Sequence, residues 1–362
     1  MTENIDVTAH YQQGNSSEQQ LSDTPLVTFV IPCYNSAEYM RRGIDLLLES
    51  INKPCEVLIV NDGSADDTSR IAHEYESEYD FVFAIDQKNM NWGGVVNTAL
   101  ARARGTYFKV LDSDDYFDKD SLAVVLGTLF DLRRDETSPD LFITNYVYDH
   151  ITDHSQKTIQ YRKLFPEDRV FTWKDMGKSN IDQQVMIHAL WFKTAILREA
   201  KVNLPINASY MDSLLVLQPM PFVKTLFYLD IDAYHYIIGR EGQSVEIDVV
   251  KSHIDQQLLA SKLAIDGYDY SKLYAQEPNC ALLMMGYISC MMSVSTIYLF
   301  KINTPAAIKK NKELWSYLER ENPTLYANVK KSLAGLANRK TALGRALAKF
   351  FYWIAQRLFK FA

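Results

Sequence analysis

Cysteine is scarce in this chain of 362 residues, which contains only four. None of them belongs to a C-x-x-C pair, the spacing that is typical of zinc sites and redox centres. A disulfide framework is also not expected, because the chain is long enough to build a large apolar core without one. We interpret the four as reduced, mostly buried thiols of a cytosolic protein; they are Cys33, Cys55, Cys280 and Cys290.

The chain also lacks an excess of positive charge and an apolar segment at its start. Lys and Arg number 38 against 45 Asp and Glu, so the net charge is −7, which argues against nucleic acid as a partner. Residues 1–25 are rich in Gln, Ser, Asn and Thr and have no apolar core like that of a signal peptide. We therefore expect a cytoplasmic protein whose residues 1–25 form a disordered tail.

Short apolar runs alternate with helix-like segments over the first third of the chain. The runs are 27–33, 56–60, 81–85 and 107–111. Strands that alternate with helices predict a parallel, doubly wound sheet, and such sheets bind ligands beyond the carboxyl ends of their strands. Asn35, Asp62 and Asp114 each follow one of these runs, so we expect them to meet in one crevice.

The run 107–111 ends abruptly in Asp112, Asp114 and Asp115. Carboxylates so close together repel one another, and a divalent cation among them removes this repulsion. Mn²⁺ and Mg²⁺ prefer oxygen ligands and bridge protein carboxylates to substrate phosphates. The alternative is an acidic turn that caps the next helix, which is the better interpretation of an isolated D-x-D. The neighbouring motifs favour the cation.

Three motifs in this order resemble the signature of family 2 glycosyltransferases. They are Ile31–Asn35 (Ile-Pro-Cys-Tyr-Asn), Val60–Ser64 (Val-Asn-Asp-Gly-Ser) followed by Asp66, and Leu111–Asp115 (Leu-Asp-Ser-Asp-Asp). The resemblance extends over residues 26–130 and more weakly to residue 250. It implies the GT-A fold, an α/β architecture with a Rossmann-like, mostly parallel sheet and flanking helices. One departure is Asn61, where the family often has an Asp that helps to hold the nucleoside.

The resemblance also implies roles for individual residues. Asp112 would contact the nucleotide ribose or the metal, Asp114 would bind Mn²⁺ or Mg²⁺, and Asp62 would hold the base or ribose. The other residues that we predict to bind the nucleotide sugar are Pro32, Tyr34, Asn35, Asn89, Gly93, Asn97, Arg240, Gln243 and Ser244.

Several of these residues lie on two segments that we predict to be loops, 87–94 and 239–245. Residues 87–94 form a glycine-containing turn of the kind that approaches a ligand closely, one residue longer than in the family. Residues 239–245 follow an aromatic strand, and the guanidinium of Arg240 would neutralise a diphosphate. A solvated surface turn is the alternative for the second loop.

Asp212 stands in a Tyr-Met-Asp sequence directly before an apolar helical stretch. By resemblance, an acidic residue at this point deprotonates the acceptor hydroxyl, so we predict that Asp212 is the general base. The alternative is a helix N-cap, a common use of Asp. His188 is ambiguous between a residue that lines the acceptor cleft and a packed core histidine.

The last third of the chain differs in character from the rest. Residues 278–300 carry no charge, and we predict a central helix of a helical region, with a membrane span as the alternative. Residues 339–362 form a basic amphipathic pattern that suits an anionic membrane surface; docking on the protein itself is the alternative. The predicted parts are 1–25, 26–250, 251–338 and 339–362.

Together these patterns predict an inverting glycosyltransferase that uses a nucleotide sugar, in our prediction a UDP-sugar, and Mn²⁺ or Mg²⁺. The predicted acceptor is a hydroxyl group of a glycan, a lipid-linked sugar or a protein, in the synthesis of cell-envelope or extracellular polysaccharide. The predicted location is the cytoplasm, peripherally on the inner face of the cell membrane. Two alternatives are a metal-dependent nucleotidyltransferase, although no glycine-rich basic loop follows the first strand, and a non-catalytic scaffold that binds carbohydrate or membrane.

Overall fold

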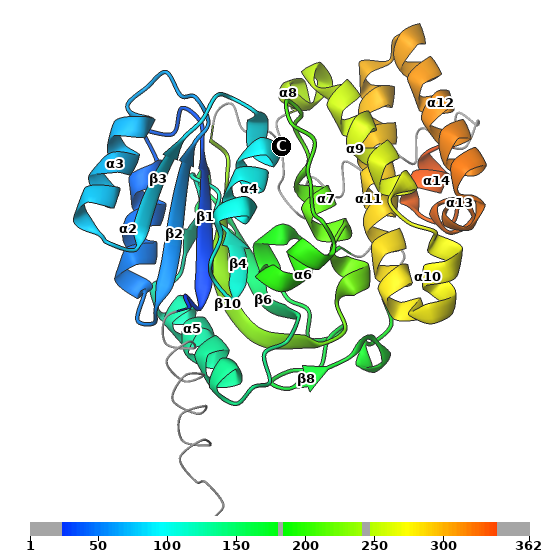
Figure 1. Cartoon of the computed structure of the whole chain (residues 1–362). Helices are drawn as coiled ribbons and strands as arrows, with labels where there is room; N and C mark the ends of the chain where they lie inside the picture. Colours follow the sequence, from blue (N-terminus) through cyan, green and yellow to red (C-terminus); the bar gives the residue numbers. More distant parts are fainter. Residues whose placement is uncertain (1–23, 180–183, 241–246, 339–362) are drawn as a thin grey trace, which may run out of the picture.

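The computed structural model describes residues 24–179, 184–240 and 247–338. Within these residues the strands join into one sheet in the order β3-β2-β1-β4-β9-β6-β10-β5, with β7 beside β6 and β8 beside β10 (Figure 1). The strands are β1 Val27–Cys33, β2 Cys55–Asn61, β3 Val82–Asp86, β4 Tyr107–Val110, β5 Tyr116–Phe117, β6 Leu141–His150, β7 Gln156–Ile159, β8 Val170–Phe171, β9 Leu190–Lys193 and β10 Leu226–Ile238.

The helices fall into two groups, one around the sheet and one after it. Those around the sheet are α2 Met40–Ser50, α3 Thr68–Glu78, α4 Asn91–Arg102, α5 Lys119–Arg134, η1 Trp173–Asp175, η2 Ile187–Ala189, α6 Thr194–Glu199, α7 Asp212–Leu217 and η3 Met220–Phe222. Those after it are α8 Ile247–Ser252, α9 Ile254–Asp266, α10 Tyr270–Gln276, α11 Pro278–Ile302, α12 Pro305–Glu321, α13 Pro323–Val329 and α14 Leu333–Ala337.

The first four strands form the parallel part of the sheet, as the alternation of strands and helices predicts. Helices α2 and α3 lie on one side of β1–β3 and α4 lies on the other (Figure 1). Strands β1 and β2 are buried along their whole length apart from Pro32, which is why they read as continuous apolar runs. The register pairs Cys33 with Asn61 and Asn61 with Asp86. The loops after β1, β2 and β3 therefore begin at the same edge of the sheet.

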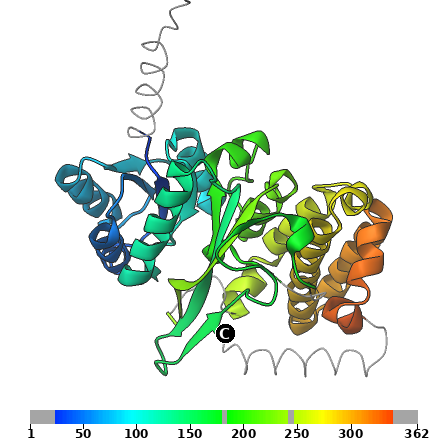
Figure 2. The same ribbon diagram turned by 90° about the horizontal axis from the view of Figure 1, so that it is seen from below.

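The rest of the sheet is mixed in direction. Strand β9 is antiparallel to both of its neighbours, β4 and β6, whereas β10 runs parallel to β6 along most of its length. Strands β6 and β10 separate the N-terminal strands and their helices from the C-terminal helices (Figure 2). The turn η2, which directly precedes β9, therefore lies at the same sheet edge as residues 112–115, which follow β4 and which we call the acidic turn.

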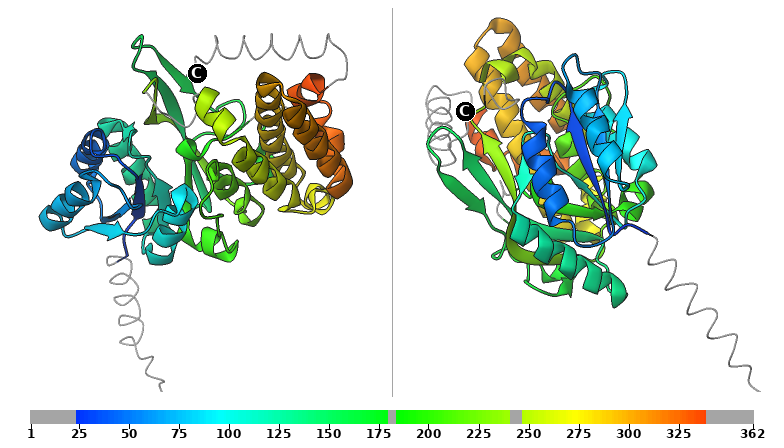
Figure 3. Two further views of the ribbon diagram at one scale, coloured as in Figure 1. Left: turned by 90° about the horizontal axis from the view of Figure 1, so that it is seen from above. Right: turned by 90° about the vertical axis from the view of Figure 1, so that its left-hand side faces the viewer.

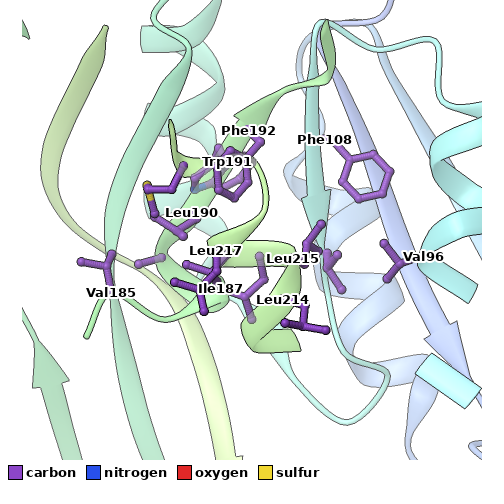
Figure 4. Packing of buried hydrophobic residues seen from close by; sticks show 14 of the residues in the cluster. Val96, Phe108, Val185, Ile187, Leu190, Trp191, Phe192, Leu214, Leu215 and Leu217 are labelled. Atoms are coloured by element: carbon purple, nitrogen blue, oxygen red, sulfur yellow. The ribbon is translucent and has the colours of Figure 1, made fainter. Parts of the chain in front are cut away.

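Helix α7 is held between the two parts of the sheet by its leucines. Figure 4 shows Leu215 of α7 between Ile187 and Leu190 on one side and Val96 and Phe108 on the other. All five side chains are buried. This packing places the first residue of α7, Asp212, on the side of the acidic turn.

The C-terminal helices form a bundle beside the sheet (Figure 3). Helix α11 is its central member, as predicted. It is the one described helix that is long and apolar enough to cross a membrane. However, 72% of its most apolar part is buried inside the protein. Its polar positions have partners within the bundle, because Trp315 Nε1 donates to Thr296 Oγ1 at 3.0 Å and Ser261 and Ser295 hydroxyls lie 3.1 Å apart.

Two local expectations are wrong in detail. The predicted loop 87–94 is a loop only to Met90, because α4 begins at Asn91 and already contains Gly93. The alternative interpretation of Asp212 as an N-cap does not hold, since α7 begins at Asp212 and Met211 occupies the N-cap position. The predictions for residues 1–23, 339–362, Gln243 and Ser244 lie outside the described residues.

Candidate active site

The loops after β1 and β2 hold each other by side chain to backbone hydrogen bonds. Asn35 has a left-handed backbone (φ 50°); its N–H donates to Ser64 Oγ at 2.9 Å, and its Oδ1 accepts from Ala65 N–H at 2.9 Å. Ser36 Oγ lies 2.9 Å from Ser113 Oγ in the acidic turn. The motif residues after three strands therefore meet, as predicted. Tyr34 remains 53% exposed at this edge, where a ligand can reach its ring.

Asp62 is buried and holds the loop that follows β3. Its Oδ1 accepts from Gln87 Nε2 at 2.7 Å and from Met90 N–H at 2.9 Å. Asn61, the departure from the family pattern, donates from Nδ2 to Asp86 Oδ1 at 2.7 Å and accepts from Ser64 N–H at 3.1 Å. These bonds orient the amide of Asn61 at the place where the nucleoside is predicted to bind.

Gly93 and Asn97 on α4 support the segment that leads to Asp212. A Cβ on Gly93 would lie 2.4 Å from the carbonyl oxygen of Pro205, so only glycine allows this approach. Asn97 Nδ2 donates to the carbonyl of Leu204 at 2.8 Å, and its Oδ1 accepts from the Leu204 N–H at 2.9 Å. The structure thus gives both residues a packing role, and their contact with a donor stays a prediction, as does that of Asn89.

The acidic turn after β4 contains one structural carboxylate and one that faces the site. Asp115 is buried; its Oδ2 accepts from the Tyr234 hydroxyl at 2.6 Å and its Oδ1 from the Ile237 N–H at 2.8 Å. Asp112 is partly exposed, and its Oδ1 accepts from Trp92 Nε1 at 3.0 Å. Asp115 therefore joins the turn to β10, whereas Asp112 keeps Oδ2 directed at the site.

Asp114 pairs with Arg240, two residues that were predicted separately. Arg240 Nη2 and Nε lie 2.8 Å and 3.2 Å from Asp114 Oδ2. The guanidinium also covers the ring of Tyr39, 4.3 Å from its centroid. The aspartate and this ring enclose the guanidinium and hold it over the acidic turn.

Asp212 occupies the first position of α7 and is partly buried. Loss of water around its carboxyl raises the pKa of Asp212 above its usual value; His188 opposes this rise and the charge of Asp112 adds to it. Both neighbours act on Asp212 through space, so the structure brings these three residues together.

His188 is the site residue that sequence reasoning left undecided. It lies in the short turn η2 and is 7% exposed. Its Nε2 is 3.7 Å from Asp112 Oδ2. No local motif marks this residue, because η2 reaches the acidic turn only through the antiparallel placement of β9.

The side chains around the acidic turn fit a divalent cation in their chemistry. Ligand atoms of Asp112, Asp115 and His188 all lie within 4.8 Å of one another. Carboxylate oxygens suit Mn²⁺ and Mg²⁺, and an imidazole suits the transition metals. Asp115 is the weakest candidate of the three, because both of its oxygens already accept hydrogen bonds.

Solved structures with the same fold are glycosyltransferases. Residues 1–349 of TarS from S. aureus, solved in complex with UDP-GlcNAc, align with 84% of this chain and 91% of that chain at a TM-score of 0.50 and 17% identity. A longer TarS structure gives a TM-score of 0.53 at 14% identity, covering 84% of this chain and 55% of that one. The protein is thus of the GT-A fold class.

Residues 28–189 match the family model described as Glycosyl transferase family 2. The chain is 37% identical to the chondroitin synthase of Escherichia coli over 125 residues, 34% of this chain and 18% of that protein. It is 30% identical over 220 residues to an uncharacterized glycosyltransferase, the MG025 homolog of Mycoplasma pneumoniae, which covers 59% of this chain and 62% of that protein. The chain is thus similar to glycosyl transferase family 2 over residues 28–189, and it spans less than two thirds of these two relatives.

Proposed function

We propose that the protein transfers a sugar from a nucleotide sugar to a hydroxyl acceptor and inverts the anomeric centre. The proposed donor is a UDP-sugar, and the proposed product is a polysaccharide or other glycoconjugate of the cell envelope. The match of residues 28–189 to the family model supports sugar transfer, the TarS complex with UDP-GlcNAc supports a uridine nucleotide, and the similarity to a chondroitin synthase supports a polysaccharide product.

The observation that carries the proposal is the environment of Asp212. This carboxylate belongs to the first helical residue and not to the N-cap, it is partly buried, and loss of water raises its pKa, with His188 opposing the rise and Asp112 adding to it. A base works best when its pKa lies near the working pH, so the raised value suits a residue that accepts a proton. An ordinary capping aspartate needs neither the burial nor the carboxylate neighbour.

The proposed reaction is a single displacement. Asp212 takes the proton of the acceptor hydroxyl, the acceptor oxygen bonds to the anomeric carbon, and the bond from that carbon to the phosphate oxygen of the nucleotide breaks. Attack from the face opposite the nucleotide gives inversion. A divalent cation bound by Asp112 and Asp114 would neutralise the diphosphate as it leaves. Arg240, held over the acidic turn, supplies a further positive charge to the same group.

The donor side is proposed to bind the nucleotide through the strand-end loops. Tyr34 offers an exposed ring, and Asn35, Asp62 and Pro32 shape the edge below it. Because Asn61 replaces an acidic residue of the family pattern, the base preference is the least constrained part of this proposal. A panel of nucleotides in a binding assay will measure it.

The test is nucleotide release from a panel of UDP-sugars and other nucleotide sugars, with Mn²⁺, with Mg²⁺ and with a chelator. We expect UDP release that depends on the cation and rises when the correct acceptor is added, and a product of inverted anomeric configuration by NMR. Release of pyrophosphate would instead identify a nucleotidyltransferase. Binding of a nucleotide sugar without turnover under any condition, including a broad acceptor panel, would contradict a transferase.

A peripheral location on an anionic membrane is proposed for the segment 339–362. Its apolar face and its Lys and Arg residues together would give reversible surface binding. Liposome flotation of the full chain and of a chain shortened to residue 338 tests this at low and high salt. Equal flotation of both proteins would reject the segment as the anchor.

A further inference from the structure

His188 is held rigidly in a position that no local sequence motif explains. Its ring stacks on the ring of Tyr236, with centroids 4.5 Å apart and planes at 19°. Tyr234 and Tyr146 pack against it at 4.9 Å and 5.5 Å between centroids. Three aromatic rings therefore fix the plane of the imidazole, and any movement of the ring would disturb the buried core beneath β10.

The backbone of His188 is fixed as firmly as its ring. The ammonium of Lys109, a fully buried residue of β4, donates to the carbonyls of Ile187 and Leu190 at 3.3 Å each and to the carbonyl of His188. A buried ammonium is costly unless its donors are used. Lys109 thus locks the turn η2 beneath the acidic turn that follows β4, so that the imidazole faces Asp112.

Among the described residues, neither ring nitrogen of His188 has a partner within hydrogen-bond distance. Nδ1 is buried and has no hydrogen-bond partner within the described part of the chain. Nε2 lies 3.7 Å from Asp112 Oδ2, which is longer than an N–H···O hydrogen bond of about 2.7–3.2 Å. A histidine that served only to orient Asp112 would lie within hydrogen-bond distance of it.

The separation of the two atoms lies within the range open to two ligands of one cation. Ligand atoms that each lie about 2.1 Å from a cation are about 3.0 Å apart at a right angle and about 4.2 Å apart when opposite. The observed 3.7 Å falls between these limits. Asp115 does not compete for this place, because Tyr234 and Ile237 occupy its oxygens.

We propose that His188 is a metal-binding residue that takes a divalent cation together with Asp112. The inference rests on the proposed function, since the cation would serve the same donor diphosphate. An imidazole nitrogen is a poor ligand for Mg²⁺ and a good one for transition metals. His188 therefore makes the site select Mn²⁺ over Mg²⁺, a preference that carboxylates alone do not provide.

The test measures Mn²⁺ binding to the full chain, with and without UDP, from the electron paramagnetic resonance signal of the Mn²⁺ that stays free. His188→Gln keeps much of the side-chain volume, and we expect it to weaken Mn²⁺ binding at least tenfold while Mg²⁺ binding changes much less. His235→Gln is the matched control: this histidine lies on β10, its side chain is 12% exposed, and its Nδ1 lies 3.5 Å from a carboxylate oxygen of Asp149. It should leave Mn²⁺ binding unchanged.

A second measurement uses the wild-type protein and does not depend on a variant that folds. Mn²⁺ should broaden the imidazole NMR signals of His188 at concentrations that leave those of His235 sharp. Unchanged Mn²⁺ affinity in folded His188→Gln, or equal broadening of both histidines, overturns the inference. Turnover of a UDP-sugar would then still support the proposed function, whereas intact Mn²⁺ binding at His188 without any nucleotide release would reject that function alone.

Discussion

We call residues 27–118 the donor half of the proposed site and residues 184–217 its acceptor half, after their proposed roles, and the two halves are built in different ways. In the donor half the site residues follow strand ends directly, and adjacent loops hydrogen-bond to one another. In the acceptor half they lie on short turns that are held by distant residues: Lys109 holds η2, Asn97 holds Leu204, and Gln256 accepts from the N–H of Ser209 at 2.6 Å.

This difference teaches where function depends on long-range contacts. A parallel sheet aligns its strand ends through its own register, so the donor half assembles locally. The acceptor half has no such frame and relies on α4, β4 and the C-terminal helix α9. Substitutions in the donor half should therefore act on nucleotide binding, and those that loosen the acceptor half should act on the acceptor.

The largest effect is expected from Asp212→Asn, which should lower transfer by about 10²–10⁴-fold because it removes a general base. Affinity for the nucleotide sugar should stay near that of the wild type, since Asp212 belongs to the acceptor half. Product formation by mass spectrometry and donor affinity by calorimetry measure the two separately.

Asp118→Asn is a matched control for this prediction. Asp118 also stands at a helix start, where it accepts from the Ser121 N–H at 2.9 Å as a true N-cap. Because Asn caps a helix about as well as Asp, this variant should change the free energy of unfolding by less than about 1 kcal/mol and leave transfer intact. If Asp212→Asn behaved in the same way, Asp212 would be structural.

Asp114→Asn should produce the next largest effect, a loss of cation-dependent donor binding and roughly a hundredfold or greater fall in turnover, because metal binding supplies several kcal/mol. The amide is a neutral, weaker ligand and also breaks the pair with Arg240. Turnover at several Mn²⁺ concentrations checks the cation dependence.

Asp230→Asn controls for the loss of an ion pair. Asp230 pairs with Arg162, and its side chain is 17% exposed, like that of Asp114. This variant should affect stability only. A comparable fall in turnover for both variants would mean that the effect of Asp114→Asn is a general loss of stability and not a loss of the cation.

Asn97→Ala tests whether a residue of the donor half controls the acceptor half. It removes two hydrogen bonds to Leu204 and should lower the free energy of unfolding by roughly 1–3 kcal/mol. We expect a higher KM for the acceptor and an unchanged affinity for the donor. The opposite pattern, weaker donor binding with a normal acceptor KM, would show that Asn97 binds the nucleotide as the family resemblance implies.

The smallest effect concerns pH and is confined to the donor half. Asp86 and then Glu76 raise the pKa of His73. Because the folded pKa is raised, the stabilisation is complete below the unfolded pKa of about 6.5 and is lost as the pH rises through the folded value. His73→Gln should therefore lower the melting temperature more at pH 5.5 than at pH 8.5.

The loss of unfolding free energy in His73→Gln should differ between the two pH values by less than about 1 kcal/mol, since the ion pair is half exposed and screened by solvent. High salt should reduce it further. A loss of melting temperature in His73→Gln that is equal at both pH values, or larger at pH 8.5, would contradict the pairing of His73 with Asp86 and Glu76.

Much of the donor half could be predicted from the sequence. Buried parallel strands give continuous apolar runs, and their ends are marked by Asn35, Asp62 and Asp112, so local patterns reveal both the strands and the edge at which they meet. Helix α11 was predictable for a similar reason, because its lack of charge extends over a whole helix.

The acceptor half was only partly predictable. A short motif before a helix led to the prediction for Asp212. That Asp212 is the first residue of α7, and that His188 and Asp112 act on it, follows from the packing of α7 and could not be predicted. The beginning of α4 at Asn91 was missed because Gly93 and Gly94 imitate a turn, whereas Gly93 is needed for close contact with Pro205.

The sequence by itself determined the strand-end chemistry, since the side-chain pattern of a strand and the residue that follows it are local properties. Only the tertiary structure decided that Asp115 is structural, that Arg240 covers Asp114, and that His188 faces Asp112. These depend on β9 and β10 joining the sheet beside strands far away in the chain. No local pattern encodes such a pairing, because it is set by the free energy of the whole packed core.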